Sequence, residues 1–297
     1  DMARAYKVLA VGDDGINPPS DKNPCTATSL IKNASFDAGN ISGWTCTFES
    51  GKNATNVGYQ GATHTNGDVS VSQFIEAWAA GDKRFNPDLT YSAIGDGKLS
   101  QTMASLPQGK YKFTCDAISV QQHQPAENPV TGVQLFATGG ELEQTQNIAT
   151  GNGLPEHFEI TFVSTGGDVE IGLRTKGATA NWIAADNFTL TYYGEVVGDP
   201  AQILLQSYIN ECTDKYDVDA YNVKAEESAK KAYAEAIANA QNATEDFEAY
   251  KAALEAAVKN LEESITLYEK LNSIISSMKK QISDAAKDWT GLSEELE

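Results

Sequence analysis

Almost the whole last third of this 297-residue sequence is free of glycine and proline, whereas the preceding part is rich in them. Neither residue occurs between positions 201 and 290. Because glycine and proline punctuate loops and break helices, their absence favours long uninterrupted helices. A chain of this length also exceeds the usual size of one hydrophobic core. We therefore expect a multidomain protein whose architecture changes near residues 198 to 200.

Basic residues are scarce: 22 Lys and Arg stand against 41 Asp and Glu, which gives a formal net charge of -19. A surface this acidic repels phosphate groups, so the composition excludes nucleic acid as a partner. The sequence also lacks an apolar run of about 20 residues, and its first residues lack the pattern of a signal peptide. We expect no membrane-spanning segment and a chain that is a mature or trimmed form.

Histidine and cysteine are too few and too scattered to form a known catalytic or zinc motif. The three histidines are isolated, the four cysteines lack zinc-type spacing, and no serine lies in a Gly-x-Ser-x-Gly turn. Carboxylates are abundant, but nothing in the sequence brings together a glycosidase pair such as Glu76 with Glu141 or Asp116. We predict that the protein is not an enzyme.

Apolar and polar residues alternate with period 2 in many short segments before residue 198, and turn residues separate these segments. Cys46 and Cys115 belong to two such segments and should face the interior, either as buried thiols or as a disulfide pair. This spacing predicts an antiparallel β-sandwich. The expected strands are 44–48, 69–74, 111–117, 133–136, 158–163, 169–173 and 188–192, with a further short strand at residues 6–9.

From residue 199 onwards the apolar pattern has the period of a helix. Asp199 is suited to an N-cap and Pro200 to the first helical position. Three apolar stripes follow, and Thr244 should cap the third helix. Because that stripe continues to Ile282, it predicts one helix of about 40 residues or a hairpin that breaks near Asn272. We expect an all-α helical bundle whose abrupt end indicates that the natural chain continues.

Three motifs resemble parts of one known fold. Residues 30–37 (LIKNASFD), followed by Gly43 and Trp44, resemble the opening of bacterial carbohydrate-binding modules of families 4, 9 and 22. Residues 182–190 (WIAADNFTL) resemble the closing strand of the same galactose-binding-like jelly roll. Residues 99–102 (LSQT) with 106–113 (LPQGKYKF) are similar to its central hairpin.

This resemblance implies an organisation and a cellular context. Residues 1–27 would form an N-terminal extension and linker, residues 28–197 an all-β jelly-roll sandwich, and residues 198–297 a helical module similar to FIVAR-type surface units. Such combinations are typical of secreted polysaccharide-handling proteins of gut Bacteroidetes, so the implied location is extracellular or at the cell surface. The family often holds a structural calcium, and Asp37 and Asp186 take the positions of its acidic ligands.

Sugar recognition needs flat aromatic rings for the C–H faces of a pyranose and planar polar groups for its hydroxyls. Trp44 alternates into the core, so we expect it to be structural. Packing remains an alternative for Trp78 and Trp182, and a solvated strand charge remains an alternative for Arg174 and Glu76. The candidate ligand-binding residues outside the inward alternation are Trp78, Phe85, Tyr91, Gln122, His123, Arg174 and Trp182.

These observations favour a non-catalytic glycan-binding module of a secreted or surface-attached bacterial protein, with a helical spacer. Polysaccharide or another glycan would be its partner. One alternative is a structural or adhesive surface protein without sugar binding, in which the helical half makes protein contacts. Another is an ancillary region of a larger glycoside hydrolase.

Overall fold

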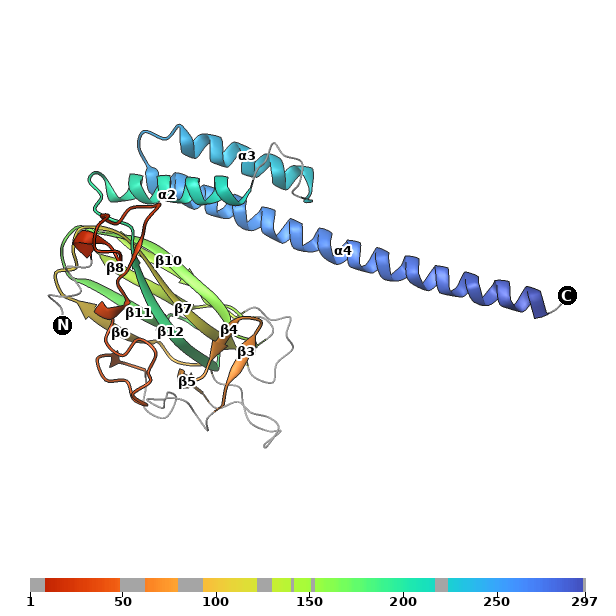
Figure 1. Cartoon of the computed structure of the whole chain (residues 1–297), viewed down its shortest axis with the longest axis horizontal. Helices are drawn as coiled ribbons and strands as arrows, with labels where there is room; N and C mark the ends of the chain where they lie inside the picture. Colours follow the sequence, from red (N-terminus) through yellow and green to blue (C-terminus); the bar gives the residue numbers. More distant parts are fainter. Residues whose placement is uncertain are drawn as a thin grey trace. The chain divides into compact units, whose positions relative to one another are not determined.

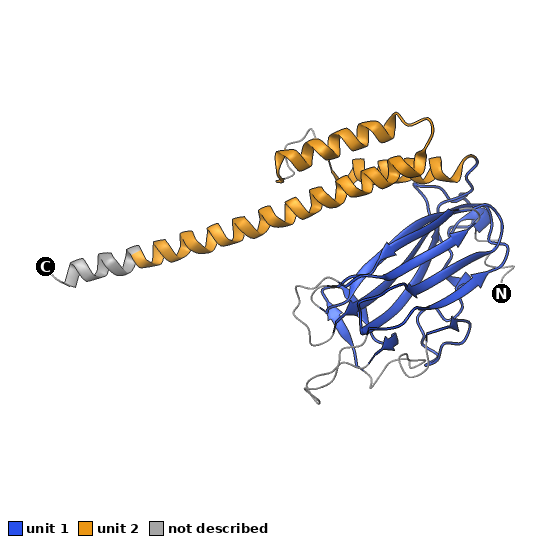
Figure 2. Cartoon of the chain, turned by 180° about the vertical axis from the view of Figure 1, so that it is seen from behind, with its two compact units in different colours: residues 1–197 blue, residues 198–297 orange. Residues whose placement is uncertain are grey.

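The computed structural model describes residues 9–48, 62–79, 93–121, 130–139, 142–150, 153–216 and 224–295, with the backbone alone for 286–295. The chain divides into two compact units, residues 1–197 and 198–297, which Figure 2 shows in separate colours. Each unit is described by itself below.

The first unit is built from antiparallel strands (Figure 1). A short 3-10 helix, η1 (Thr28–Leu30), follows the first strand. The described strands are β1 (Cys25–Thr26), β2 (Thr45–Cys46), β3 (His64–Asn66), β4 (Val69–Val71), β5 (Ile75–Trp78), β6 (Gly97–Met103), β7 (Gly109–Val120), β8 (Val133–Gly139), β9 (Leu142–Asn147), β10 (Glu156–Ser164), β11 (Val169–Thr175) and β12 (Trp182–Tyr192).

Two five-stranded sheets form a β-sandwich. The first, here called the β12 sheet, has the order β1-β12-β7-β10, and β5 pairs with β12 beside β1. The second, the β11 sheet, has the order β2-β6-β11-β8-β9. Strands β3 and β4 form a separate hairpin. Residues of both sheets share one hydrophobic core, so the predicted all-β sandwich is confirmed.

The core follows from the alternation of side chains along each strand. In β7, Tyr111, Phe113 and Cys115 are fully buried, whereas Lys112 between them is only partly buried. Every second residue of a strand points to the same face, so this pattern sends one row of side chains into the sandwich. At roughly 25 cal/mol per Å² of buried apolar surface, these rows dominate the stabilisation of the unit.

Several local predictions are wrong at strand ends. Leu9, expected in a strand, is helical, and residues 6 to 8 of that expected strand lie outside the described residues. The expected strand 69–74 ends early: β4 stops at Val71, Ser72 and Gln73 form a bend, and β5 begins only at Ile75. The expected strand 44–48 is only the short β2. No disulfide links any of the four cysteines, and Cys115 is buried whereas Cys46 is partly buried.

The second unit is an all-α bundle of α2 (Pro200–Lys215), α3 (Glu227–Gln241) and α4 (Phe247–Glu295). Asp199 caps α2 as predicted, because its Oδ1 accepts a hydrogen bond from the Ala201 N–H at 2.9 Å. Helix α4 runs through Asn272 without a break, so the single-helix alternative is correct. It begins at Phe247 and not at Thr244, because the backbone carbonyl of Asp246 accepts its first hydrogen bonds.

The bundle core occupies only the first part of α4. Residues of α2 and α3, such as Ile209 and Tyr233, pack against Leu254, Val258 and Leu261 of α4. Among the described residues, no helix has both the length and the apolar character that crossing a bilayer requires.

Candidate functional site

Two tryptophans lie side by side on the face of the β12 sheet that points away from the sandwich core. In the antiparallel pair of β5 and β12, Trp78 is directly opposite Trp182. Side chains at directly opposite positions of such a pair lie on the same face, about 4.5–5.5 Å apart at Cβ. Trp78 is 41% exposed, whereas Trp182 is only 8% exposed. The indole of Trp78 is therefore open to solvent, whereas that of Trp182 is buried.

A buried carboxylate fixes the second indole. The Trp182 Nε1–H donates a hydrogen bond to Oε2 of Glu76 at 2.9 Å, and Glu76 is only 9% exposed. Glu76 precedes Trp78 by two residues in β5, so both side chains point to the same face. No described residue donates a hydrogen bond to the other carboxylate oxygen of Glu76. A carboxylate has about four acceptor positions, so Glu76 can accept further hydrogen bonds from a ligand.

The hairpin of β3 and β4 packs over this part of the β12 sheet and encloses Trp182. The ring centroids of His64 and Phe74 lie 5.4 and 6.3 Å from that of Trp182. Val71, Phe74, Ile118, Trp182 and Ala184 form a small hydrophobic cluster, separate from the main core. Trp182 is therefore held by packing as well as by its hydrogen bond.

A polar network continues along the same face of the sheet. Asp116 contacts Nδ1 of His157 through Oδ1 at 2.8 Å and accepts a hydrogen bond from Nδ2 of Asn187 through Oδ2 at 2.9 Å. The same Asn187 amide donates to the backbone carbonyl of Ser70 in β4, at 2.8 Å. These contacts join β7, β10, β12 and the hairpin, so the network holds the hairpin against the sheet.

Asp186 ties the turn between β4 and β5 to β12. Its Oδ2 accepts the backbone N–H groups of Ser72 and Gln73 at 3.0 and 3.1 Å, and its Oδ1 accepts that of Asn187 at 2.7 Å. The residue is 2% exposed. Burial removes water from this carboxyl and raises its pKa, against the lowering effect of the three N–H groups. Asp186 thus has a structural role that the sequence did not reveal.

Asp37 and Asp186, the two expected calcium ligands, provide only a few oxygen donors. Asp37 is exposed, and its Oδ2 accepts a hydrogen bond from Ser35 Oγ at 2.6 Å. Burial is the main cause of the raised pKa of Asp186, and the negative charge of Asp37 adds to it. Calcium takes six to eight oxygen ligands, and no group of three or more His, Cys, Asp or Glu in the described chain could hold a metal. These residues alone do not complete a calcium site, and calcium stays a prediction.

Arg174 lies on the other sheet. On the outward face of the β11 sheet, its guanidinium donates to both oxygens of Glu143, at 2.6 and 2.9 Å, and to Gln134 Oε1 at 2.8 Å. It also lies over the ring of Phe136, 5.3 Å from the centroid. The guanidinium hydrogen bonds hold the pKa of Glu143 below its ordinary value. Arg174 is therefore a paired strand charge that does not join the two tryptophans.

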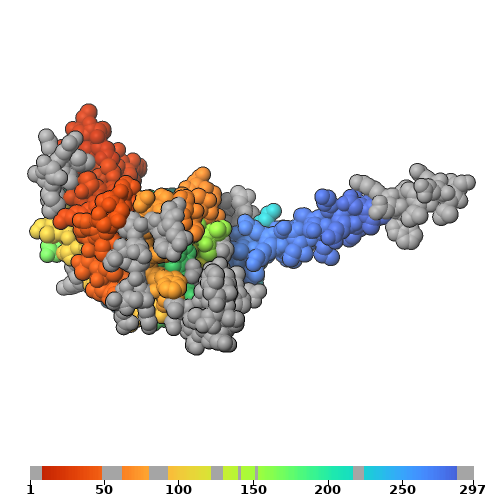
Figure 3. All heavy atoms as spheres, turned by 90° about the horizontal axis from the view of Figure 1, so that it is seen from below, coloured from red at the N-terminus to blue at the C-terminus, as the bar shows by residue number. Residues whose placement is uncertain are grey.

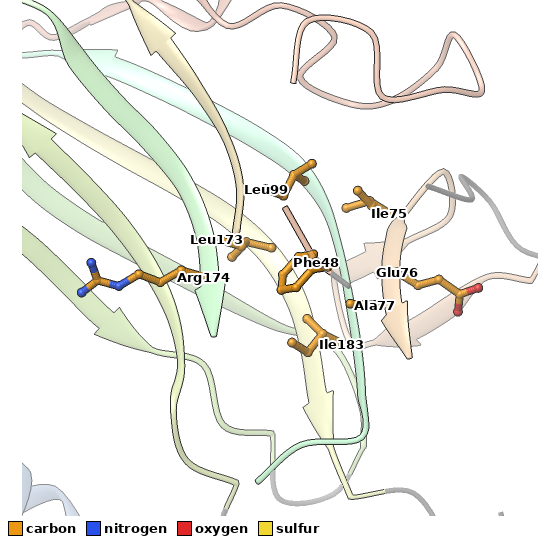
Figure 4. A pocket seen from close by; sticks show the side chains of 8 residues that line it. All are labelled: Phe48, Ile75, Glu76, Ala77, Leu99, Leu173, Arg174 and Ile183. Carbon is orange, nitrogen blue, oxygen red and sulfur yellow. The ribbon is translucent and has the colours of Figure 1, made fainter. Parts of the chain in front are cut away.

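A small apolar pocket lies between the two sheets, among Phe48, Ile75, Leu99, Leu173 and Ile183. Glu76 and Arg174 also border it, but Figure 4 shows their side chains pointing away from it on opposite sides. Its volume of about 10 Å³ accommodates roughly one water molecule, so it cannot hold a sugar ring.

The candidate site is thus smaller than the set of residues that the sequence suggested. Trp78 and Trp182 are brought together, whereas Phe85, Tyr91, Gln122 and His123 lie outside the described residues. Glu76 and His64 were not expected to take part. The alternation of Ile75, Glu76, Ala77 and Trp78 was the available signal, because it places the acid on the face of the exposed tryptophan.

Comparison with known proteins adds little at the level of sequence. No protein-family model matches the chain, and no curated protein matches it. Among solved structures, a family 61 carbohydrate-binding module in complex with β-1,4-galactotriose has 18% identity and a TM-score of 0.37, over 54% of this chain and 96% of that chain. A Stig cyclase from Fischerella sp. TAU has 17% identity and a TM-score of 0.38, over 56% of this chain and 97% of that chain.

A family 4 carbohydrate-binding module has 15% identity and a TM-score of 0.33, over 55% of this chain and 99% of that chain. Scores at this level carry no argument about function. The class of the protein, an antiparallel β-sandwich followed by an all-α bundle, is defined by its own sheets and helices.

Proposed function

We propose that the β-sandwich is a non-catalytic glycan-binding module of a secreted or surface-attached protein, and that the helical unit acts as its spacer. One observation carries this proposal: the open indole of Trp78 lies beside the fixed pair of Trp182 and Glu76. In the described part of the sandwich, Trp78 is the only exposed aromatic among the large apolar side chains.

The chemistry of this arrangement matches that of a sugar. A pyranose presents a C–H face that stacks on an indole, and hydroxyl groups at its edge that donate hydrogen bonds. Trp78 provides the flat surface, and Glu76 provides an acceptor about two residues away along the strand. Because the hydrogen bond from Trp182 holds Glu76 in place, little side-chain entropy is lost at Glu76 when a ligand is bound.

The motifs that resemble carbohydrate-binding modules support the same proposal. The opening segment and the closing strand meet in space, where the Phe188 N–H donates to the Ala34 carbonyl at 3.0 Å. The rings of Phe36, Trp44 and Phe188 pack together there, with centroids 4.9–5.9 Å apart. The residues that carry the resemblance therefore form one structural unit.

The state of the acids supports a non-catalytic role. A glycosidase needs two carboxylates about 5–10 Å apart, one of which protonates or activates a reactant. Both oxygens of Asp116 are engaged by His157 and Asn187, and Asp186 accepts three backbone N–H groups. Glu141, the other acid weighed as a partner of Glu76, lies outside the described residues.

The test is a glycan array with the full chain, followed by titration calorimetry with the best glycan. Trp78→Ala should weaken binding by about 5- to 150-fold, since loss of a stacking face costs roughly 1–3 kcal/mol by analogy with base stacking. Leu154→Ala is the matched control, because Leu154 is also 41% exposed. Binding that survives Trp78→Ala at full strength, or that falls equally in both variants, would refute the assignment. An array without any bound glycan would favour the structural or adhesive alternative.

A further inference from the structure

The second half of α4 carries a long apolar stripe that is exposed to solvent. Beyond Ile265, large apolar residues recur every three or four positions, at 267, 268, 271, 274, 275, 278 and 282. This spacing places them on one face of the helix. Figure 3 shows this part of α4 from one side, in blue. Exposed fractions are 66% for Leu267, 41% for Tyr268, 53% for Leu271, 56% for Ile274, 38% for Ile275, 55% for Met278 and 68% for Ile282.

The stripe continues an interface that already exists in the chain. Leu254 and Leu261 of α4 belong to the bundle core with residues of α2 and α3. At intervals of seven residues the same row continues through Tyr268, Ile275 and Ile282 of the stripe. Helix α4 has 49 residues, whereas α2 and α3 have 16 and 15. At 1.5 Å per residue, the 33 residues by which α4 exceeds α2 correspond to roughly 50 Å of further helix. Helices in water draw most of their stability from a buried apolar face. The extended part of α4 would therefore be more stable with another helix packed against its apolar face.

Polar residues are arranged so that the stripe stays uncharged. Lys270 and Lys280 point away from its centre, and Glu269 lies on the opposite side of the helix. Asn272 and Gln281 flank the stripe, and Lys279 is the charged residue nearest to its edge. Charges at flanking positions normally select a particular foreign helix and set its orientation. The apolar face of α4 has few flanking charges. It can therefore pack against the same face of a second copy with little repulsion between like charges.

The area of the stripe is suited to a pair. Seven large apolar residues, each 38–68% exposed, form a patch of several hundred Å² per copy, of the same order as the about 800 Å² per partner of a standard interface. Isolated apolar patches of this size are rare on soluble monomers. We propose that this face of α4, residues 267–282, is an interface on which a second copy of the chain packs. The proposal does not depend on glycan binding.

Sedimentation equilibrium of the full chain tests it. The wild-type protein should show twice the 31.9 kDa of one chain at tens of micromolar. Leu271→Asp combined with Ile275→Asp should return the mass to that of one chain, because each substitution places a charge in the apolar face. Ser273→Asp combined with Ser276→Asp is the matched control: it adds the same two charges on the far side of the helix and should leave the pair intact.

A neutral variant separates loss of pairing from loss of the helix. Leu271→Gln with Ile275→Gln keeps helix-forming residues and should also dissociate the pair, while circular dichroism reports unchanged bundle melting. A wild-type chain that stays monomeric at 100-fold higher concentration would overturn the proposal. So would an Asp variant that still pairs, or a control variant that dissociates as readily as the Asp variant.

Discussion

The hydrogen bond between Trp182 and Glu76 provides the sharpest test of the candidate site. The Trp182 Nε1–H and Glu76 Oε2 are 2.9 Å apart, and both side chains are less than 10% exposed. Trp182→Phe keeps an aromatic ring in the cluster with Phe74 but removes the donor. The Glu76 carboxylate then remains buried without that partner, which should destabilise the sandwich.

The size of the effect follows from the burial of the pair. Loss of one partner of a buried hydrogen bond costs about 1–3 kcal/mol, and more where the remaining group is charged. The smaller phenyl ring adds a cavity term, because cores relax only partly around a deletion. We expect Trp182→Phe to cost roughly 2–4 kcal/mol in the free energy of unfolding. Glu76→Gln should cost less, because its amide oxygen can still accept the indole N–H.

A double-mutant cycle isolates the hydrogen bond from the packing. Trp182→Phe, Glu76→Leu and the double variant would be unfolded with urea, with near-UV circular dichroism reporting the sandwich and far-UV dichroism the helices. The coupling energy should be about 1.5–3 kcal/mol, the range for hydrogen bonds to charged groups. Additive effects, with a coupling below about 0.5 kcal/mol, would refute the claim that Glu76 is held by Trp182.

Two further predictions concern the acids. Arg174→Met should make the free energy of unfolding fall less steeply in acid. Glu143 has a folded pKa below its ordinary 4.5, because Arg174 donates hydrogen bonds to its carboxylate. The stability that this ion pair contributes is present above pH 4.5 and is lost as the pH falls through the folded pKa of Glu143. Thermal melts between pH 7 and 3 measure this, and equal slopes in both proteins would contradict it. If Asp37 and Asp186 hold calcium, chelation should lower the melting temperature of the sandwich by several degrees. An unchanged melting temperature would refute the calcium site. Asp186 would then act only through its three backbone hydrogen bonds.

Local patterns in the sequence were sufficient for most central strands. The alternation is visible in β7 and in the second half of β12, the expected strands 111–117 and 188–192. Residues 182–186 of β12 are buried on both faces, so their strand left no period-2 pattern. β9 was not predicted, because this edge strand (Leu142–Asn147) is largely exposed and polar. Its pairing with β8 depends on backbone hydrogen bonds, which leave no trace in side-chain hydrophobicity.

Long-range contacts explain the remaining differences. The break between β4 and β5 is stabilised by Asp186, more than 110 residues further along the chain. Trp78 and Trp182 are 104 positions apart, and their pairing depends on the register of β5 against β12. A sequence pattern shows which face a residue occupies but not which distant strand lies beside it. For this reason the sequence leaves a solvated charge open as an alternative for Glu76, whereas in the structure β12 supplies its hydrogen-bond donor.

The two proposals act on different quantities, and so they can be separated. In the proposed function Trp78 sets how strongly one sandwich binds one sugar, whereas in the proposed pair the apolar face of α4 sets how many sandwiches one assembly carries. A stacked ring gives weak binding by itself, and two linked sites raise the apparent affinity for a polymer by about 100- to 10,000-fold where both can engage. Substitutions in α4 would then weaken binding to a polysaccharide but not to a short oligosaccharide. Trp78→Ala would weaken both, because it changes each site and not their number.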